Sequence, residues 1–322
     1  MSPLFGKKTA PTTVAIIDIE SGSIGSGLVE ISGTHKPRLM GQERRILHIR
    51  GTPSASLLLK EIEREMEDSL VRLSGIASRM GNYRGAPGDI GRVAVFLHAP
   101  WASVSIGPER AKADAHDATL DALRTVSSGV LSTTPASFHA FSTTATPIIH
   151  GLFNAPRESL VVSIGGEIAE LSLLKGGTMV GHATMPLGLH TVLRTLESHA
   201  GLSRAEALSV LSLSRSTHEH AWAEALSSGV AQISRELSGT VASMLPDSKH
   251  AQQIFILAPK QSSDFFARAF TEDASLHELF APGSTIRAVL PRHATPHLLG
   301  HPSQPDLPLL LESLFVDTRF GA

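Results

Sequence analysis

Apolar and polar residues alternate along the first third of the chain in blocks that predict short strands around one long helix. Residues 14–19 are β-branched and apolar, 20–27 are small or polar, and 28–31 are apolar again, which indicates a strand, a turn and a second strand. Between residues 54 and 80, apolar side chains recur at steps of three and four, as on the buried face of an amphipathic helix. A connector rich in glycine and proline, 81–91, leads to a buried-type strand over 92–99.

The strand pattern returns later in the chain. Residues 159–164, 168–174 and 179–185 predict three strands, the first two joined by a tight turn at Gly165 and Gly166. Helices are expected over 188–200, 203–213 and 219–244. A strand at 253–258, a helix to about residue 270, a strand at 286–290 and a short helix at 308–316 complete the chain. The repeated pattern indicates two duplicated halves that meet between residues 150 and 158.

The segment 109–158 has weaker signals. A helix is predicted over 115–126, and the clusters of Ser, Thr and Pro at 132–137 and 142–147 predict loops around a short strand.

Composition narrows the class of protein. The chain has 322 residues, 42% hydrophobic and 18% charged, which suits about two soluble domains. Its 28 Lys and Arg against 30 Asp and Glu give a net charge of −2, which argues against nucleic acid as a partner. The absence of cysteine excludes disulfides, thiolate metal sites and a cysteine nucleophile. No apolar run has the length of a membrane span, so we expect a cytoplasmic protein without direct membrane insertion.

Three transitions from strand to turn are the candidate binding sites, at 18–23, 163–167 and 258–263. A carboxylate at a strand end can hold hydrated Mg²⁺, and Gly or Ser turns let backbone N–H groups approach phosphate oxygens. Each transition also has a purely structural explanation, because tight turns need glycine. The segment 22–27, GSIGSG, is neither a Walker A loop nor a dinucleotide fingerprint, because it lacks Gly-Lys-Ser/Thr and opens onto a strand.

The order of these three segments resembles that of a known superfamily. The segments 16–24 (IIDIESGSI), 163–177 (SIGGEIAELSLLKGG) and 254–263 (IFILAPKQSS) are similar to the phosphate-1, phosphate-2 and adenosine motifs of the actin-like ATPases. The chain most resembles the branch with the cell-division protein FtsA and the type IV pilus assembly protein PilM. The resemblance implies an α/β, actin-like (ribonuclease H-like) duplicated two-domain fold with a central cleft.

The resemblance also implies boundaries and binding residues. The halves would be 1–157, with a short or altered insert around 109–150, and 158–322, with a helical subdomain at about 188–250. ATP and Mg²⁺ would be the cofactors, with Asp18 as the metal ligand. The implied nucleotide-binding residues are Asp18, Ser21, Gly22, Ser23, Ser163, Gly165, Gly166, Glu167, Ala258 and Pro259.

All three loops depart from the family pattern. Glu20 stands where the first loop has Gly, and its carboxylate would crowd and repel a phosphate. Ser163 replaces the Asp that helps to position metal and water in the second loop. Residues 258–260, Ala-Pro-Lys, replace Gly-Gly in the third. We therefore predict a vestigial nucleotide site without catalytic residues.

Two functions follow from the resemblance. The first is a bacterial, cytoplasmic pseudo-ATPase scaffold for type IV pilus assembly or cell division. Its partners would be an inner-membrane pilus component, a division protein or another copy of the chain, and it would be recruited to the inner face of the membrane. The alternative is an active ATP-binding and ATP-hydrolysing enzyme that holds Mg²⁺ with Asp18, Glu20 and Glu167.

Overall fold

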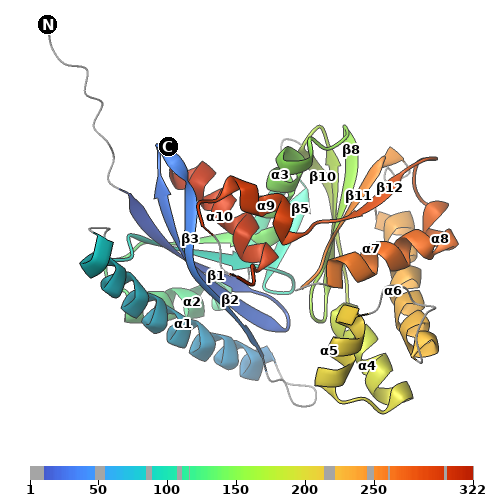
Figure 1. Cartoon of the computed structure of the whole chain (residues 1–322), viewed down its shortest axis with the longest axis horizontal. Helices are drawn as coiled ribbons and strands as arrows, with labels where there is room; N and C mark the ends of the chain where they lie inside the picture. Colours follow the sequence, from blue (N-terminus) through green and yellow to red (C-terminus); the bar gives the residue numbers. More distant parts are fainter. Residues whose placement is uncertain are drawn as a thin grey trace, which may run out of the picture.

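Two five-stranded sheets with the same topology form the centre of the molecule (Figure 1). The structure, a computed structural model, describes residues 11–47, 55–84, 89–106, 111–115, 117–213, 222–244, 250–259, 262–300 and 303–321. The first sheet has the order β3-β2-β1-β4-β7 and the second the order β10-β9-β8-β11-β12. In each sheet, three consecutive antiparallel strands are extended by two parallel strands that follow later in the chain. The expected duplication is therefore present in the fold.

The observed strands agree with the predicted ones wherever the sequence has a continuous run of apolar residues. The first sheet contains β1 (Thr12–Ile19), β2 (Ser23–Ser32), β3 (His35–Ile46), β4 (Arg92–Leu97) and β7 (Ala136–Ala140). The second contains β8 (Glu158–Ile164), β9 (Ala169–Lys175), β10 (Thr178–Met185), β11 (Gln253–Leu257) and β12 (Thr285–Ala288). Sequence analysis did not predict β3, which is largely polar because it lies at the edge of its sheet.

Helices cover both faces of the first sheet. The apolar stripe of α1 (Ala55–Arg84), with Ile62, Met66 and Leu70, is buried in one core cluster with alternate residues of β1. On the other face lie α3 (Phe141–Phe153) and α10 (Leu307–Phe320). Because β1 is covered on both faces, nearly all of its residues are buried.

The segment 109–158 contains more structure than predicted. A two-stranded sheet of β5 (Ala102–Ile106) and β6 (Ala111–Ala115) precedes α2 (Asp117–Val130). The predicted loop at 142–147 is wrong, because these residues lie inside α3. Phe141, Ala145 and Ile149 form a buried stripe at steps of four, and this apolar packing outweighs the low helix propensity of the Thr and Pro residues.

The helices of the second half lie around its sheet. They are α4 (Leu189–Ala200), α5 (Arg204–Leu213), α6 (Ala223–Met244), α7 (Ser262–Glu272), α8 (Ala274–His277), α9 (Pro291–Ala294) and the 3₁₀ turn Thr295–His297. The larger ones were predicted to within a few residues. Among the described residues, none of the helices combines the length and hydropathy that crossing a lipid bilayer requires.

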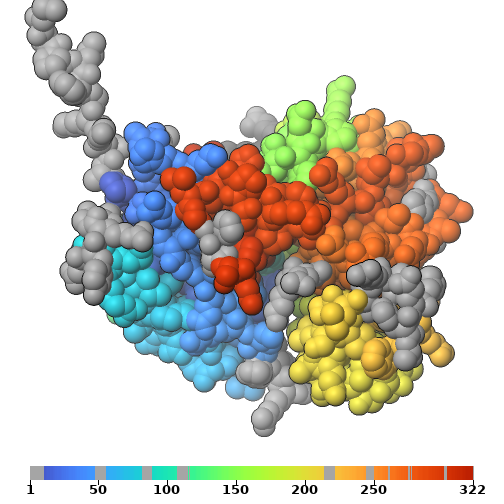
Figure 2. Space-filling model, in the orientation of Figure 1, coloured from blue at the N-terminus to red at the C-terminus, as the bar shows by residue number. Residues whose placement is uncertain are grey.

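The C-terminal helix connects the two halves. Although α10 belongs to the predicted second half by sequence, it packs against β1, β2 and β3 of the first sheet and against α3. Figures 1 and 2 place this red C-terminal segment between the blue first sheet and the orange second half. The division at residue 158 stays a prediction.

Candidate functional site

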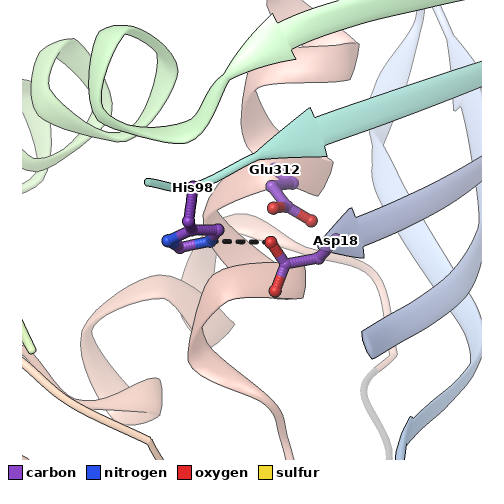
Figure 3. A group of neighbouring side chains, drawn as sticks. All are labelled: Asp18, His98 and Glu312. Atoms are coloured by element: carbon purple, nitrogen blue, oxygen red, sulfur yellow. Dashed lines mark hydrogen bonds and ion pairs between the residues drawn. The ribbon is translucent and has the colours of Figure 1, made fainter. Parts of the chain in front are cut away.

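Asp18 is the centre of a buried group of charged side chains at the ends of β1 and β4. The two strands are parallel, with Asp18 opposite Phe96, so His98, just beyond β4, lies next to the Asp18 carboxylate. His98 Nε2 lies 2.7 Å from Asp18 Oδ1, and the dashed line in Figure 3 marks this contact. The guanidinium of Arg44 donates to the other oxygen, Oδ2, at 2.5 Å. Both carboxylate oxygens of Asp18 therefore have a cationic partner within the chain.

Arg44 reaches Asp18 from β3, across β2. A Cβ atom at Gly25 would lie 2.7 Å from the Arg44 side-chain nitrogen, so the absence of a side chain at Gly25 leaves the space that the guanidinium occupies. Arg44 also donates to Ser23 Oγ at 2.9 Å and to both carboxylate oxygens of Asp306, at 2.6 and 2.9 Å. It thus connects β1 with the start of α10, where Asp306 is the N-cap residue.

On the other side, the group extends into the second half. His98 Nδ1 lies 3.5 Å from Oε1 of Glu170 in β9, and the same oxygen accepts from the backbone N–H of Ala99 at 3.1 Å. The other oxygen of Glu170 lies 3.3 Å from His182 Nε2 in β10. His98 therefore bridges a carboxylate of each half.

These contacts determine the protonation states of the buried groups. Burial opposes ionisation of Asp18, but the charges of His98 and Arg44 and their hydrogen bonds outweigh it and hold the pKa of Asp18 well below its ordinary value. Burial alone would favour neutral His98, yet Asp18 and Glu170 raise the pKa of His98 to about 10. The pKa of Glu170, despite burial, is lowered to about 2 by its bonds to His182 and His98. At neutral pH we therefore assign an ionised Asp18, a protonated His98 and an ionised Glu170, which lie next to one another in this order.

Glu312 is the exception in this group. It lies in α10 and points toward Asp18 (Figure 3), its side chain is buried, and neither of its oxygens has a hydrogen-bond partner among the described residues. Burial raises the pKa of Glu312 well above its ordinary value, and the negative charge of Asp18 adds to this effect. Both effects favour the protonated, uncharged form of Glu312 beside the ionised Asp18.

The first and second predicted loops lie in direct contact. The Oγ of Ser21 accepts from the backbone N–H of Glu167 at 3.0 Å. A Cβ atom at Gly166 would lie 3.2 Å from Gly22 Cα, which shows how closely the two backbones approach. Phosphate oxygens between these two glycines would need this contact to open.

Glu20 occupies the space beside the second loop. Its Oε2 accepts from Ser23 Oγ at 2.8 Å, and its Oε1 would lie 3.3 Å from a Cβ atom at Gly165. The carboxylate of Glu20 is thus turned toward the glycine pair of the second loop. A negative charge there repels an incoming phosphate.

Glu167 and Ser163 have neighbours other than the Asp18 carboxylate. Glu167 pairs with His190 Nδ1 and with Arg194, each at 2.9 Å, and the hydrogen bond from His190 is the main reason why the pKa of Glu167 falls to about 2. Ser163 is half-buried in β8, opposite Glu170 of β9 and Leu257 of β11. Glu167 therefore has its own cationic partners, whereas Asp18 and Glu20 share Arg44, whose Nη1 lies 4.0 Å from Glu20 Oε2.

The third loop is stabilised by its own serines. Ala258 donates its backbone N–H to Ser263 Oγ at 2.8 Å, and that hydroxyl donates back to the Ala258 carbonyl at 3.1 Å. Pro259 accepts from the backbone N–H of Ser262 at 3.2 Å. Among the described residues, the hydrogen bonds of this loop stay within it, and Lys260 lies outside the described residues.

The donor set around Asp18 does not fit Mg²⁺. Oxygens of Asp18, Glu312 and the imidazole nitrogen of His98 lie within 4.8 Å of one another, close enough to surround a small ion. Mg²⁺, however, needs six oxygen ligands, mostly water, and Asp18 already accepts from a guanidinium and an imidazolium. These two positive charges already balance the Asp18 carboxylate, so the donor set as arranged does not fit Mg²⁺.

Sequence analysis did not single out Arg44, His98, Glu170 and Glu312 as site residues. Three of them left a signal, a charged or polar residue inside or just after an apolar run: His98 after 92–97, Glu170 within 168–174 and Glu312 within 307–315. Arg44 does not stand out in the sequence in this way, because β3 is polar along most of its length.

Three solved structures share this fold over nearly the whole chain. A structure of the PilM–PilN type IV pilus biogenesis complex has a TM-score of 0.63 and 15% identity, and covers 97% of this chain and 98% of the other. MreB5 of Spiroplasma citri bound to AMPPNP has a TM-score of 0.55, 8% identity, and coverages of 96% and 95%. The ethanolamine utilization protein EutJ from Carboxydothermus hydrogenoformans has a TM-score of 0.54, 10% identity, and coverages of 97% and 91%.

No protein-family model matches the chain, and no curated protein matches it. At such low identity, the shared feature is the fold.

Proposed function

Given that this chain has the duplicated two-domain fold of the actin-like ATPases, we propose that it is a protein scaffold of the FtsA and PilM type whose nucleotide site has been replaced by ion pairs of the chain itself. Fold does not determine function, so the proposal depends on the site and not on the likeness alone.

The observation that carries the proposal is the state of Asp18. Arg44 and His98 take both oxygens of its carboxylate, and the first two loops touch at Gly22 and Gly166. A nucleotide with its metal would have to break two charge-assisted hydrogen bonds and separate the loops, at a cost of several kcal/mol. Glu20 would then still face the phosphates. A pseudo-ATPase is the function that this geometry supports best.

The role in a cell is proposed from the fold relationship. The PilM–PilN structure is a type IV pilus biogenesis complex of two proteins, which supports a function in protein assembly. We propose that this chain binds an inner-membrane pilus component or a division protein at the inner face of the membrane, or associates with itself. Pull-downs against the pilus and division proteins of the same organism test this role, and failure to bind members of either machinery would count against it.

Nucleotide binding is tested by calorimetric titration of the purified protein with Mg·ATP and Mg·ADP, together with a thermal-shift scan. A ligand at about 100 times its Kd stabilises the native state by about 2.7 kcal/mol. We expect no heat of binding and no change in Tm at about 5 mM nucleotide, which excludes a Kd below roughly 50 µM.

Two variants distinguish a vestigial site from an active one. If ATP is hydrolysed, Asp18→Ala should abolish phosphate release, whereas Arg124→Ala, on the exposed face of α2, should not change it. Saturable binding with phosphate release that depends on Asp18 would favour the alternative, an active ATPase, and overturn the proposal.

A further inference from the structure

The outer edge of β12 is the open edge of the second sheet. The other edge strands have neighbours in the described part of the chain. Leu299 N–H bonds to the Pro37 carbonyl of β3, and Lys36 Nζ to the Pro296 carbonyl, each at 2.8 Å. β7 contacts β5 and β6, and β10 contacts β5. In the described part of the chain, β12 has β11 on one side and no strand on the other. Figure 1 shows β12 at this margin of the sheet.

The register of β12 identifies which backbone groups face outward. Thr285 N–H bonds to the Gln252 carbonyl at 3.1 Å, and Val289 N–H bonds to the Ile256 carbonyl at 2.8 Å. Since backbone direction alternates along a strand, the groups of residues 285, 287 and 289 face β11. Those of Ile286 and Ala288 face the open edge, where an added strand can bond to them.

A groove runs beside this edge. It has a volume of about 360 Å³ and lies between α7, β12 and α9. On the α7 side its floor includes Ala267, and on the β12 side the half-buried Ile286. The groove therefore offers apolar surface directly next to the outward-facing backbone groups.

The two walls of the groove differ in charge. On α7, Asp264 and Glu272 each lie one helical turn from Arg268, so this wall carries one more negative charge than positive. On the other wall, Arg287 and Arg292 are exposed, and Arg287 stacks over the Phe153 ring at 4.5 Å. Burial and the nearby arginines lower the pKa of His293, which keeps its imidazole neutral. The wall formed by β12 and α9 is thus positive.

We propose that the open edge of β12 binds an extended segment of a partner protein as an added strand. The segment carries acidic residues at alternating positions, facing Arg287 and Arg292, and apolar residues between them, facing Ile286 and Ala267. Backbone hydrogen bonds to Ile286 and Ala288 supply affinity, while the alternation of charge and apolar groups supplies specificity. This inference is independent of nucleotide binding and would stand if the chain were an active ATPase.

The test begins with a library of random twelve-residue peptides displayed on phage and selected against the folded chain. We expect enriched peptides to alternate acidic and apolar residues. The best sequence, made as a fluorescent synthetic peptide, is then titrated by anisotropy against the native chain and three variants. An equal-length peptide with lysine in place of each acidic residue serves as the ligand control.

The variants separate the charge from the backbone. Arg292→Glu reverses the charge of the basic wall and should weaken binding by roughly tenfold or more. Ile286→Pro removes an outward N–H without removing a bond to β11, so it should abolish binding of the added strand. The variant should still fold, because proline is tolerated in edge strands. Arg235→Glu, on an exposed position of α6, is the matched control and should leave affinity unchanged.

Amide hydrogen exchange gives a readout that does not depend on variants. Bound peptide should slow exchange at Ile286 and Ala288 and leave Thr285 and Val289, which already bond to β11, unchanged. The proposal is overturned if selection enriches no acidic peptide, or if the peptide binds Arg292→Glu as well as the native chain. Binding without protection of these two amides would also contradict it, and circular dichroism confirms that each variant is folded.

Discussion

At the scale of single residues, buried charges occur as a chain in which each ionised group has an opposite partner. Asp306, Arg44, Asp18, His98 and Glu170 alternate in sign. A buried charge without a partner costs several kcal/mol, so removing one member should cost more than its own hydrogen bonds. Glu312 lies next to Asp18, and burial together with the charge of Asp18 raises its pKa and so favours its uncharged form.

His98 should make stability fall as the pH rises above neutrality. The pKa of its imidazole is about 10 in the folded protein against an ordinary value of 6.5. A raised pKa contributes stability that is complete below about 6.5 and is lost as the pH approaches about 10, by up to roughly 1.4 kcal/mol per pH unit. Urea unfolding at pH 7.5, 8.5 and 9.5 measures this slope.

His98→Gln should remove the part of this pH dependence that comes from one proton, about 1.4 kcal/mol of unfolding free energy per pH unit. His139→Gln is the control, because burial lowers the pKa of His139 to about 4 and its titration ends below this range. Equal slopes in the native chain and His98→Gln would show that His98 is neutral.

Glu312 and Glu170 should respond differently to the same substitution. Glu312→Gln replaces a protonated carboxyl with a neutral group of the same shape, and should change the free energy of unfolding by no more than about 1 kcal/mol at pH 7. Glu170→Gln removes an ionised partner of His98 and should cost about 3 kcal/mol or more. Denaturant unfolding of both variants checks the contrast, and a larger cost at Glu312 would mean that its side chain is ionised.

At the scale of elements, α10 connects a C-terminal segment to the first sheet. Its leucines at 309, 310 and 311 are fully buried between α3 and the strands β1 to β3. Asp306 caps the helix by accepting from the Leu309 N–H at 3.3 Å, while its carboxylate also pairs with Arg44. Apolar packing and the Asp306–Arg44 ion pair therefore hold the same helix in place.

Leu310→Ala should destabilise the protein by about 2–5 kcal/mol, because it removes a fully buried side chain and leaves a cavity. Leu57→Ala in α1 is the matched control, since its side chain is 61% exposed and its loss should change stability by less than about 0.5 kcal/mol. Chemical denaturation measures both, and similar values for the two variants would show that α10 contributes little to the core.

At the scale of the whole molecule, two duplicated sheets are joined where their first loops meet. Gly22 and Gly166 occupy equivalent turns, one after β1 and one after β8, and the absence of side chains lets them touch. His98 bridges Asp18 and Glu170 nearby. The halves are thus connected by close backbone contact and by charge.

Gly166→Ala should weaken this connection. The new Cβ atom would lie 3.2 Å from Gly22 Cα, which requires the loops to separate slightly, and we expect a loss of about 1–3 kcal/mol with faster limited proteolysis. Gly75→Ala, in the middle of α1, meets only the end of Arg79 at 3.8 Å and should raise stability by about 0.5–1 kcal/mol. A neutral effect at Gly166 would argue that the halves move freely.

The sequence by itself determined the local elements and their repetition. Runs such as 14–19 and 159–164 become strands, and the stripe of α1 becomes a buried helix face, because spacing along the chain decides which side chains share a surface. The turns after β1 and β8 also lie where the sequence predicts them.

Only the tertiary structure decided what surrounds Asp18. Its partners Arg44 and His98 are 26 and 80 residues away, and Asp306 is 262 residues from Arg44. Sheet order and the docking of α10 bring them together, and periodicity has no information about such distant pairs. The sequence placed Glu20 directly after the first strand, but the ion pairs on Asp18 and the contact between Gly22 and Gly166 depend on how the two halves pack.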